Sequence, residues 1–599
     1  MKRWVWLGLL GCAAACNDAH EPYPPASARD SDCASASGQA LPPEERSWEA
    51  VGRDAEAPVS TADGREPFLV RYRRAVPTAL AARTATDAVT RAGGQVTVRW
   101  SHLDAVAARL TPEQRMALDQ DPDVLSIERD GRVHAFARQA LAVTGSVGEY
   151  TEGLQQVQAP RVWDADNDGV LDAAAPNGSG IKVCVIDSGW DHRHPELQAA
   201  YAGGKDFVDG DDEPLDFDRH IGKWGSGHGT HTAATIAAQL GAHGTVEPGE
   251  EPNGVVGVAP GVELLVARVL NLRGQGNDSA IISALAWCQQ QGARIASLSL
   301  GTPNRSALVK EAVTHAVDAG MLVIAASGNS GTGDSATEPH ISYPAAFDGV
   351  VAVGAVSFNG ERPSFSQVGP QLSLVAPGVG VLSATVLQGA SYSQVAVDGR
   401  TIESHSVAFA PVGQYSGKVL VCGLGDSLDA CGREATCDGF VAYVDHGGLD
   451  ETGYRLSSAR KVTNLRRAGA RAVIIGNDDP SQGTGAFGLH GEGTWVPAAS
   501  VSHVSGSTIK GLEGREATVH IIGVDYERLE GTSMAAPHVS GVAALLWSAR
   551  PTLTAAQVRQ LLEDSAQDLG LAGRDNTFGF GLVQAKRALD LLQTRYPRP

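Results

Sequence analysis

The chain lacks several features that mark membrane, nucleic-acid-binding and zinc proteins. An apolar run at residues 4–15 is too short to span a bilayer, and no later stretch is apolar enough to do so. Only 48 lysines and arginines stand against 68 aspartates and glutamates, and this net charge of -20 argues against a nucleic-acid partner. Aromatic residues make up 6% and glycines number 70, as in tightly packed α/β proteins. Four histidines without zinc-motif spacing are interpreted as structural: His192, His194, His231 and His538.

The beginning of the chain predicts an export signal and a spacer. A positively charged start, an apolar run and a small-residue cleavage site make residues 1–16 a signal peptide. The residues before Cys12, and less well those before Cys16, resemble bacterial lipoprotein signals, in which the cysteine is lipidated. Both secretion and lipid anchoring to a bacterial membrane stay open. Residues 17–65 are rich in proline, serine, alanine and acidic residues, which predicts a disordered spacer, and Cys33 within it has no evident partner.

Residues 66–138 have the pattern of a compact α+β unit. The predicted order is strand, helix, strand, strand, helix, strand, which is ferredoxin-like. The strands are expected at residues 68–72, 96–100, 105–110 and 124–128. The first helix is expected at residues 84–92, and Thr111 and Gln114 give the second helix a capping-box start.

Three short stretches carry residues suited to nucleophilic catalysis. Ser533 opens a long apolar helix, at whose N-terminus free backbone N–H groups can hold a negative oxygen. Asp187 ends a β-branched run that predicts a buried parallel strand, and His228 has glycines on both sides. A serine hydroxyl needs a base within hydrogen-bond reach and an acid that orients the base. Each residue alone would be interpreted as a helix cap or a surface residue, but the three together predict a catalytic triad.

These stretches resemble the sequence motifs of the subtilisin family of serine proteases. The motifs here are Val-Ile-Asp-Ser-Gly around Asp187, Gly-His-Gly-Thr-His around His228 and Gly-Thr-Ser-Met-Ala-Ala-Pro around Ser533. The resemblance implies these three residues as the triad. It implies Asn329, at the end of Ala-Ala-Ser-Gly-Asn, as the side chain that stabilises the oxyanion. It also implies that the chemistry requires no cofactor.

The catalytic domain is expected in two parts, residues 139–385 and 524–599. Strand patterns alternate with helical ones there, which predicts an α/β fold, a parallel sheet with helices on both faces. By resemblance, two segments form the substrate-binding edges and the main specificity pocket: Ser299, Leu300, Gly301, Ala326, Ser327 and Gly328. Their small side chains suggest a roomy pocket for an apolar or mixed side chain, and an extended peptide would pair with the edge strand.

Residues 386–523 interrupt the catalytic domain before the serine motif. The segment is too long for a structureless loop, and it has strand and helix patterns of its own. It resembles the protease-associated (PA) domain that is inserted in many subtilisin-like enzymes. Two interpretations stay open for it, a device for substrate selection or cleft gating, and a stable surface insert.

The position of residues 66–138 just before the catalytic domain resembles that of the family's propeptide, which acts as folding template and inhibitor. The tail of this unit is then expected to lie in the cleft as a product until it is cut. The cut is expected between about Ala135 and Glu149, and the choice of bond stays open.

One acidic stretch is spaced like a calcium loop. Its aspartates surround a turn glycine: Asp164, Asp166, Asp168 and Asp172. Position twelve of an EF-hand falls on Ala175, so the full motif is absent, and a solvated acidic turn is an equally open interpretation. Glu196 matches a calcium-ligand position of the family, although the partner loop near residues 251–255 departs from the usual pattern. Calcium is therefore a candidate structural ion.

The eight cysteines suit an oxidising compartment. Cys422, Cys431 and Cys437 cluster within the insert, which predicts at least one local disulfide. Cys184 and Cys288 are either buried thiols or a pair, and their spacing leaves both interpretations open.

Together these observations predict a secreted serine endopeptidase, made as an autoprocessed zymogen, that hydrolyses proteins or peptides through an acyl-enzyme. Its expected partners are its substrates and its own propeptide, with no nucleic acid, and with a membrane only through a lipid anchor. One alternative is a catalytically silent scaffold that binds a surface ligand through its insert, but the intact catalytic positions disfavour it. A lipase or esterase is disfavoured because Ala535 occupies the second glycine position of the Gly-x-Ser-x-Gly elbow.

Overall fold

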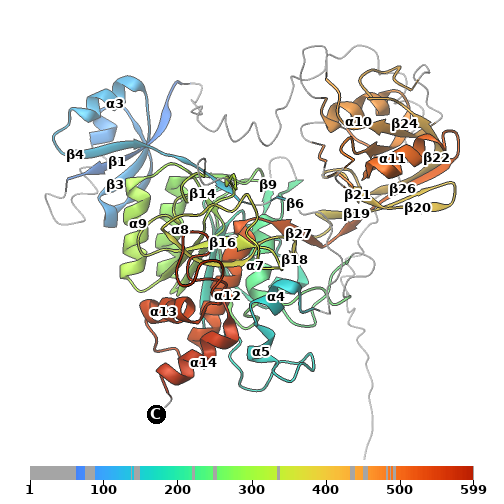
Figure 1. Cartoon of the computed structure of the whole chain (residues 1–599). Coiled ribbons are helices and arrows are strands. Elements are labelled where there is room, and N and C mark those ends of the chain that lie inside the picture. The colour runs from blue at the N-terminus through green and yellow to red at the C-terminus, as the bar shows by residue number, and fades with distance from the viewer. Residues whose placement is uncertain are drawn as a thin grey trace, which may run out of the picture.

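In the computed structural model, the described residues fold into three bodies: an N-terminal unit, a central α/β body and an inserted domain (Figure 1). The described residues are 63–73, 88–136, 138–139, 149–218, 223–246, 252–333, 338–431, 439–449, 456–480, 483–485, 487–489 and 494–597. The expected signal peptide and nearly all of the expected spacer lie outside them. So do four of the cysteines discussed above: Cys12, Cys16, Cys33 and Cys437.

The N-terminal unit is a four-stranded antiparallel sheet with the strand order β2-β3-β1-β4, as the ferredoxin-like pattern requires. Its elements are β1 (Glu66–Tyr72), β2 (Gln95–Trp100), β3 (Ala105–Leu110), α3 (Pro112–Asp119) and β4 (Val124–Arg129). The capping box of Thr111 and Gln114 starts α3 as predicted. Because successive strand residues point to opposite faces, Phe68 and Val70 pack with Leu118 of α3. Leu69 faces the other way and joins the core of the central body.

The central body is built on seven parallel strands in the order β17-β16-β15-β13-β7-β11-β8. The strands are β7 (Lys182–Asp187), β8 (Tyr201–Asp206), β11 (Glu263–Arg268), β13 (Ile295–Leu298), β15 (Leu322–Ala326), β16 (Val351–Val356) and β17 (Leu372–Pro377). Several consist almost wholly of buried apolar residues, as parallel strands covered on both faces do.

Helices cover both faces of this sheet, which confirms the predicted fold class. The long helices are α7 (His228–Ala237), α8 (Asp278–Gln290), α9 (Ala307–Asp318), α12 (Thr532–Ala549), α13 (Ala555–Ser565) and α14 (Ala585–Arg595). Shorter elements are α4 (Glu152–Gln156), α5 (Pro160–Trp163), α6 (Pro195–Gln198), β9 (Phe217–Asp218) and β10 (Lys223–Trp224). Val183 and Val185 of β7 pack in the cluster that holds α7, α12, α13 and α14. Cys184 and Ile186 face α8 and α9, where Cys184 forms a disulfide with Cys288.

The insert is a second mixed sheet of eight strands in the order β20-β19-β26-β22-β23-β24-β25-β21. Its elements are β19 (Ala390–Val397), β20 (Arg400–Ile402), β21 (Ser404–Ser406), β22 (Gly413–Val421), β23 (Phe440–Asp445), α10 (Ser458–Arg467), β24 (Ala470–Gly476), β25 (Ala498–Val501), α11 (His503–Lys510) and β26 (Glu516–Val524). Two buried apolar clusters lie within it, one with α10 and one with α11. The segment is therefore a domain with its own core.

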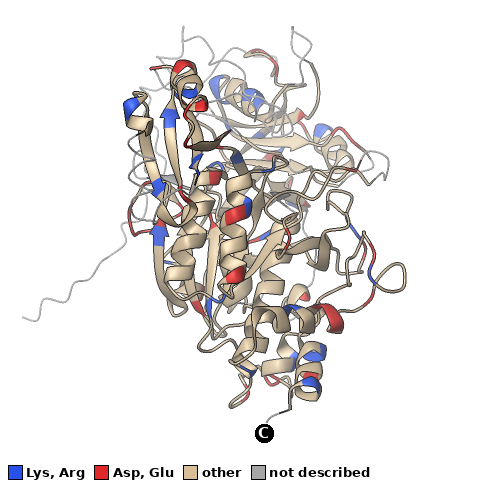
Figure 2. Ribbon diagram, turned by 90° about the vertical axis from the view of Figure 1, so that its left-hand side faces the viewer, with Lys and Arg blue, Asp and Glu red and all other residues tan. Residues whose placement is uncertain are grey.

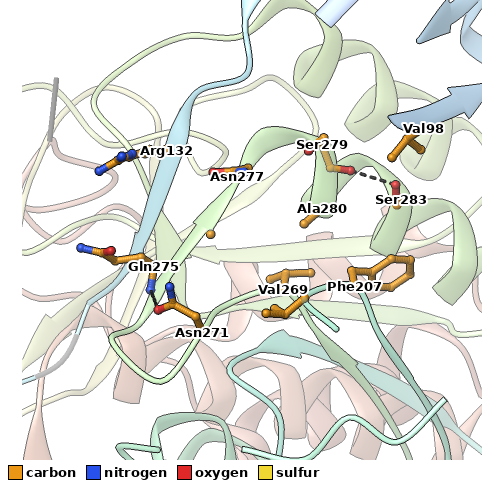
Figure 3. A pocket seen from close by; sticks show the side chains of 12 residues that line it. Val98, Arg132, Phe207, Val269, Asn271, Gln275, Asn277, Ser279, Ala280 and Ser283 are labelled. Carbon is orange, nitrogen blue, oxygen red and sulfur yellow. Dashed lines mark hydrogen bonds between the residues drawn. The ribbon is translucent and has the colours of Figure 1, made fainter. Parts of the chain in front are cut away.

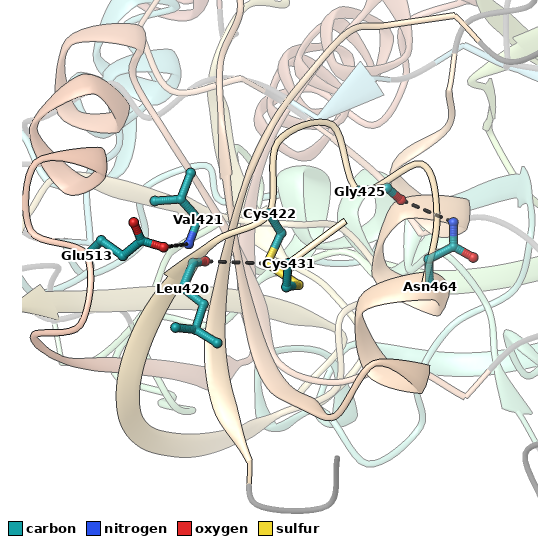
Figure 4. Close-up of a disulfide and its surroundings, with 7 residues drawn as sticks. All are labelled: Leu420, Val421, Cys422, Gly425, Cys431, Asn464 and Glu513. Carbon is teal, nitrogen blue, oxygen red and sulfur yellow. Dashed lines mark hydrogen bonds between the residues drawn. A yellow bond between two sulfur atoms is a disulfide. The ribbon is translucent and has the colours of Figure 1, made fainter. Parts of the chain in front are cut away.

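One predicted disulfide of the insert is present (Figure 4). Cys422 follows β22 and is bonded to Cys431, nine positions later, which closes a short loop. Beside it, the Asn464 side chain of α10 donates to the Gly425 carbonyl at 3.1 Å. The disulfide and this hydrogen bond tie the loop to the body of the insert.

The insert joins the central body through two antiparallel strands, β18 (Val381–Ala384) and β27 (Tyr526–Glu530). Only Asp525 separates β27 from the last strand of the insert. The Asp525 N–H donates to the Thr245 carbonyl at 2.8 Å, and its own carbonyl accepts from the Thr385 N–H at 2.8 Å. The root of the insert is therefore hydrogen-bonded to the catalytic body.

The long elements of the central body carry few charges, and the charged residues of both signs are interspersed over the outer parts (Figure 2). Those charges that are buried in the centre therefore need specific partners. Arg268, for example, is 2% exposed and bonds Asp206 and Asp209, each at 2.7 Å. No helix in the described part of the chain is both long and apolar enough to cross a membrane.

Candidate active site

Asp187 and His228 meet at the carboxyl end of the central sheet. Asp187 is the last residue of β7 and His228 the first residue of α7, and both are buried. The His228 Nδ1 lies 2.6 Å from the Asp187 Oδ1. The same carboxylate accepts the Ser188 N–H at 2.7 Å and the Thr232 hydroxyl at 3.2 Å. Several donors therefore fix the carboxylate that orients the imidazole.

The glycines beside His228 are required by close packing. Gly227, the residue before the helix, has a φ of 73°, in the left-handed region that glycine tolerates best. A Cβ at Gly229 would lie 2.1 Å from the Gly189 carbonyl oxygen. The two turns that carry Asp187 and His228 can therefore approach closely only because these positions have no side chain.

Ser533 is the second residue of α12 and is fully buried. Its hydroxyl donates to the Ser299 carbonyl at 2.8 Å and accepts the Phe136 N–H at 3.1 Å. The His228 Nε2 is buried and makes no hydrogen bond to any residue that the structure describes. The serine–imidazole hydrogen bond of the predicted triad is therefore absent in this state, in which the hydroxyl proton points to Ser299.

Asn329 follows β15 and points at the same place. Its Nδ2 donates to the Phe136 carbonyl at 2.9 Å, and its Oδ1 accepts both the Thr532 N–H and the Thr532 hydroxyl at 2.9 Å. The Thr532 contacts fix which end of the amide faces Phe136. A Cβ at Gly531 would lie 2.1 Å from the Phe136 carbonyl oxygen, so a glycine is needed for that oxygen to enter.

Residues 132–136 and 138–139 form a crossing segment at this site, with one short strand in each stretch. β5 (Arg132–Ala135) lies antiparallel between β12 (Gln275–Asn277) and β14 (Leu300–Gly301). β6 (Arg138–Gln139) pairs with β27 on the other side of Ser533. The Phe136 carbonyl, which is bonded to Asn329, therefore lies between two strand pairings.

The predicted substrate-binding residues fall into two groups. Leu300 and Gly301 pair with the crossing segment, and a Cβ at Gly301 would lie 2.8 Å from the Phe136 ring, so its absence makes room for that ring. The Phe136 side chain also packs against the apolar cluster that contains Ala326. Ser299, Ser327 and Gly328 bond to neighbours of the site: Ser533, the Gln367 carbonyl and the Thr532 hydroxyl, respectively.

Other residues of the site carry no motif that the sequence could have shown. No sequence motif marks β12, and Thr532 stands out in the sequence only as the neighbour of Ser533. Val133 of the crossing segment is fully buried among residues of several elements, including Ile281, Val309 and Phe347. A cavity of about 340 Å³ lies beside β12, with Val98 and Arg132 on one side and Phe207 on the other (Figure 3).

The acidic loop brings three of its carboxylates together. Among the described residues, the one group with metal-ligand spacing is Asp164, Asp166 and Asp168, whose ligand atoms lie within 4.8 Å of one another. Oxygen donors of this kind suit calcium. Asp172 accepts the Ala165 N–H at 2.8 Å from the side of the same loop.

Glu196 is not part of that cluster. Its Oε1 accepts the Tyr526 hydroxyl at 2.8 Å and the Val255 N–H at 3.2 Å, and burial raises the pKa of Glu196 to about 8. Its Oε2 is buried and makes no hydrogen bond within the described residues. The expectation of Glu196 as a calcium ligand therefore stays a prediction.

Three of the four histidines interpreted as structural are bonded to backbone carbonyls. His194 contacts the Asp525 carbonyl at 3.1 Å, His231 the Val381 and Glu527 carbonyls at 3.1 Å, and His538 the Met534 carbonyl at 2.7 Å. Burial lowers the pKa of His231 to about 3 and that of His538 to about 4. These rings are therefore neutral packing elements at ordinary pH.

Comparison with known proteins agrees with this geometry. A family model described as Subtilase family matches residues 178–406 and 504–581, and one described as PA domain matches residues 390–509. The alkaline protease of Alkalihalobacillus alcalophilus is 38% identical over 308 residues, which are 51% of this chain and 68% of that protein. Subtilisin E of Bacillus subtilis (strain 168) is 32% identical over 343 residues, which are 57% of this chain and 78% of that protein.

One solved structure resembles most of the chain. Fervidolysin from Fervidobacterium pennivorans, described as a keratinolytic enzyme related to subtilisin, has a TM-score of 0.53 and 21% identity. The match covers 88% of this chain and 61% of that chain. At this identity the likeness concerns the fold alone.

Proposed function

The chain belongs to the subtilase family and is a serine endopeptidase, and we propose that it acts through Ser533, His228 and Asp187 after cutting its own propeptide. The observation that supports this most is the crossing segment, residues 132–136 and 138–139, whose two strands pair at the site as an extended substrate would. Its Phe136 is bonded at both ends of its backbone, to Ser533 and to Asn329.

The proposed reaction begins with the Ser533 hydroxyl turning from the Ser299 carbonyl toward the His228 Nε2. That nitrogen is a free acceptor, because Nδ1 is bonded to Asp187. The Ser533 Oγ then forms a bond to the carbonyl carbon of the substrate, and His228 takes the hydroxyl proton. Asp187 stabilises the imidazolium that forms.

The negative oxygen of the tetrahedral intermediate is held by Asn329 and by the Ser533 backbone N–H at the start of α12. The Asn329 Nδ2 is already 2.9 Å from the carbonyl of Phe136. His228 next gives its proton to the departing amine, and the peptide bond breaks. A water molecule then gives a proton to His228 and attacks the acyl-enzyme. His228 returns this proton to Ser533, and the carboxylic acid product is released.

In the precursor this chemistry would cut the bond between Phe136 and Ala137. That bond lies within the range expected from the sequence, and the two flanking strand pairings support it. Residues up to Phe136 would then remain as the bound propeptide, with Phe136 as the product carboxyl end. The mature enzyme would begin at Ala137.

The same segment suggests which substrates the enzyme prefers. The Phe136 ring occupies the space left by Gly301, so an aromatic or large apolar residue before the cut bond is favoured. Val133, three residues earlier, is buried in an apolar pocket, so a second apolar residue is favoured there. Proteins or peptides in extended form are the substrate class.

We also propose that the enzyme works outside the cytoplasm, either secreted or held by a lipid at Cys12 or Cys16. The disulfide between Cys184 and Cys288 supports an oxidising compartment. A calcium ion held by Asp164, Asp166 and Asp168 would add structural stability and take no part in the chemistry.

The test uses the precursor and its Ser533→Ala variant, both purified and incubated alone. The wild type should mature and yield a new N-terminus at Ala137, and the variant should remain intact while its thermal unfolding stays near that of the wild type. Self-maturation of the variant, or a wild-type cut elsewhere, would contradict the proposal. Labelling by a fluorophosphonate, expected for wild type only, separates the enzyme from a catalytically silent scaffold.

A further inference from the structure

A second buried carboxylate, Asp216, lies beside the Asp187–His228 pair and has no part in the mechanism above. It is 0% exposed. Its Oδ2 accepts the N–H of Gly227, the residue before His228, at 2.8 Å. Its Oδ1 is buried and makes no hydrogen bond within the described part of the chain. A carboxylate in this position is costly for folding, which suggests a functional reason for its presence.

The backbone of Asp216 connects the two turns of the site. Its N–H donates to the Trp190 carbonyl at 3.1 Å, in the segment that follows Asp187. Its carbonyl accepts the Gly225 N–H at 2.7 Å, in the turn that precedes His228. A Cβ at Gly225 would lie 1.9 Å from the Asp216 Oδ1, so the carboxylate and this turn fit together only through glycine.

The positive charges around Asp216 compensate the negative charge of its carboxylate only weakly. Arg268 of β11 is the nearest cation that acts on it, but Arg268 is already bonded to Asp206 and Asp209 at 2.7 Å each. Burial raises the pKa of Asp216 to about 7, and the Asp187 carboxylate adds to the rise. The Gly227 N–H, Arg268 and the Ser188 hydroxyl oppose it.

Among the described residues, the other ionisable groups near Asp216 do not supply a counter-charge. His231 lies one turn further along α7, and burial lowers its pKa to about 3, so it stays neutral. Asp191, after Trp190, is paired with Arg193 at 2.6 Å. His228 therefore remains the group whose positive charge, formed during the reaction, can be attracted by an ionised Asp216.

We propose that Asp216 is a positioning residue of this peptidase, which holds the turn before His228 and, when ionised, stabilises the imidazolium together with Asp187. The inference rests on the proposed function of His228 as the base. It implies that two buried carboxylates, and not one, set the basicity of the imidazole.

The test compares the dependence of kcat/KM on pH in the processed wild-type enzyme and in Asp216→Asn. The amide oxygen of asparagine can still accept the Gly227 N–H, so the turn is retained and only the charge is lost. The acid limb should move to lower pH by about 0.5–1 unit, because the imidazolium loses a nearby negative charge. The control is Asp212→Asn, in the same loop, whose 84% exposed side chain is screened by water. Its acid limb should stay within about 0.2 unit of the wild type.

A folded, active Asp216→Asn enzyme with an unchanged acid limb would overturn the inference. An inactive wild type would instead overturn the proposed function, so the two failures are distinguishable. A second measurement needs no variant: the low-field proton resonance of the His228 Nδ1–H, followed by NMR in the processed wild type from about pH 5 to 9. Two inflections are expected from the coupled groups, and a single inflection would refute the coupling even where Asp216→Asn does not fold.

Discussion

Replacing Asp278 with asparagine should weaken the pH dependence of the release of the cleaved N-terminal unit. Asp278 is the first residue of α8 and is 4% exposed, and its N–H donates to the Gly131 carbonyl at 2.9 Å. Its carboxyl group is packed so closely that a Cβ at Gly131 would lie 2.6 Å from its Oδ2. The neighbouring Asp130 accepts the Ser279 N–H at 2.9 Å and the Ser279 hydroxyl at 2.7 Å.

These contacts decide where a proton binds at the interface. Burial raises the pKa of Asp130, although the two Ser279 donors act to lower it. Burial also raises the pKa of Asp278 well above its usual range, with Asp130 and Glu128 adding to the rise. Release exposes Asp278 at a helix N-terminus, where its pKa falls back toward the ordinary range of an aspartate. The complex therefore holds a proton that the separated parts do not.

The sign and the size of the effect follow from this difference. A pKa raised in the complex stabilises the complex most at low pH, and this stabilisation is lost as the pH rises toward the raised value. In that interval the dissociation constant increases about tenfold, or about 1.4 kcal/mol, for each pH unit. His134 acts in the opposite sense, since burial lowers its pKa, so the comparison belongs above about pH 7, where a free histidine is already neutral.

The assay follows the lag before peptide cleavage appears when the purified, cleaved complex is diluted into buffers between about pH 7 and 8.5. The wild-type lag should shorten with rising pH, and the Asp278→Asn lag should depend less steeply on pH, because only Asp130 then keeps a raised pKa at this interface. The control is Asp318→Asn, which removes an exposed carboxylate from the end of α9. The reasoning fails if Asp278→Asn keeps the wild-type slope, or if the wild type shows none.

Three further outcomes are expected. Asn329→Ala should lower kcat by about 10²–10³-fold with little change in KM, because the donor acts on the transition-state oxygen; steady-state kinetics on a peptide amide check this. Gly301→Val should lower kcat/KM more for peptides with phenylalanine before the cut bond than for those with alanine, because its Cβ would lie 2.8 Å from the Phe136 ring; some loss is expected for both, since the Cβ would also lie 2.6 Å from the Tyr343 carbonyl oxygen, and equal losses would argue against that pocket. Chelation by EDTA should lower the unfolding temperature of the wild type by a few degrees and leave Asp166→Asn unaffected, as scanning calorimetry can show.

Local patterns were sufficient for the elements that carry the candidate site. A β-branched run predicted the strand ending at Asp187, and β7 covers Lys182–Asp187. The helix expected after the His228 motif is α7, and the apolar run after Ser533 is α12. These predictions succeed because each depends on a short run of apolar residues and on glycines at close turns. Both signals can be seen in residues that are neighbours in the sequence.

Other features depend on residues far apart in the chain. Cys184 and Cys288 could have been free thiols by their spacing, and they pair because alternation along β7 turns Cys184 toward α8. Glu196 accepts the hydroxyl of Tyr526, 330 residues away, on β27. No local pattern contains that contact, since it forms only where the chain has returned from the insert to the central body.

By itself, the sequence determined the α/β class, the inserted domain and the residues from which a nucleophile, a base and an acid are proposed. Only the tertiary structure decided that Phe136 lies at Ser533 and Asn329, because the register of β5 between β12 and β14 is set by packing from three parts of the chain. It also decided that Asp216, 29 positions after Asp187, is buried and bonded to the N–H of Gly227, the residue before His228. Burial and strand register are properties of the whole fold, and they set the charge and the position of side chains. A sequence motif identifies such a residue but gives neither its charge nor its position.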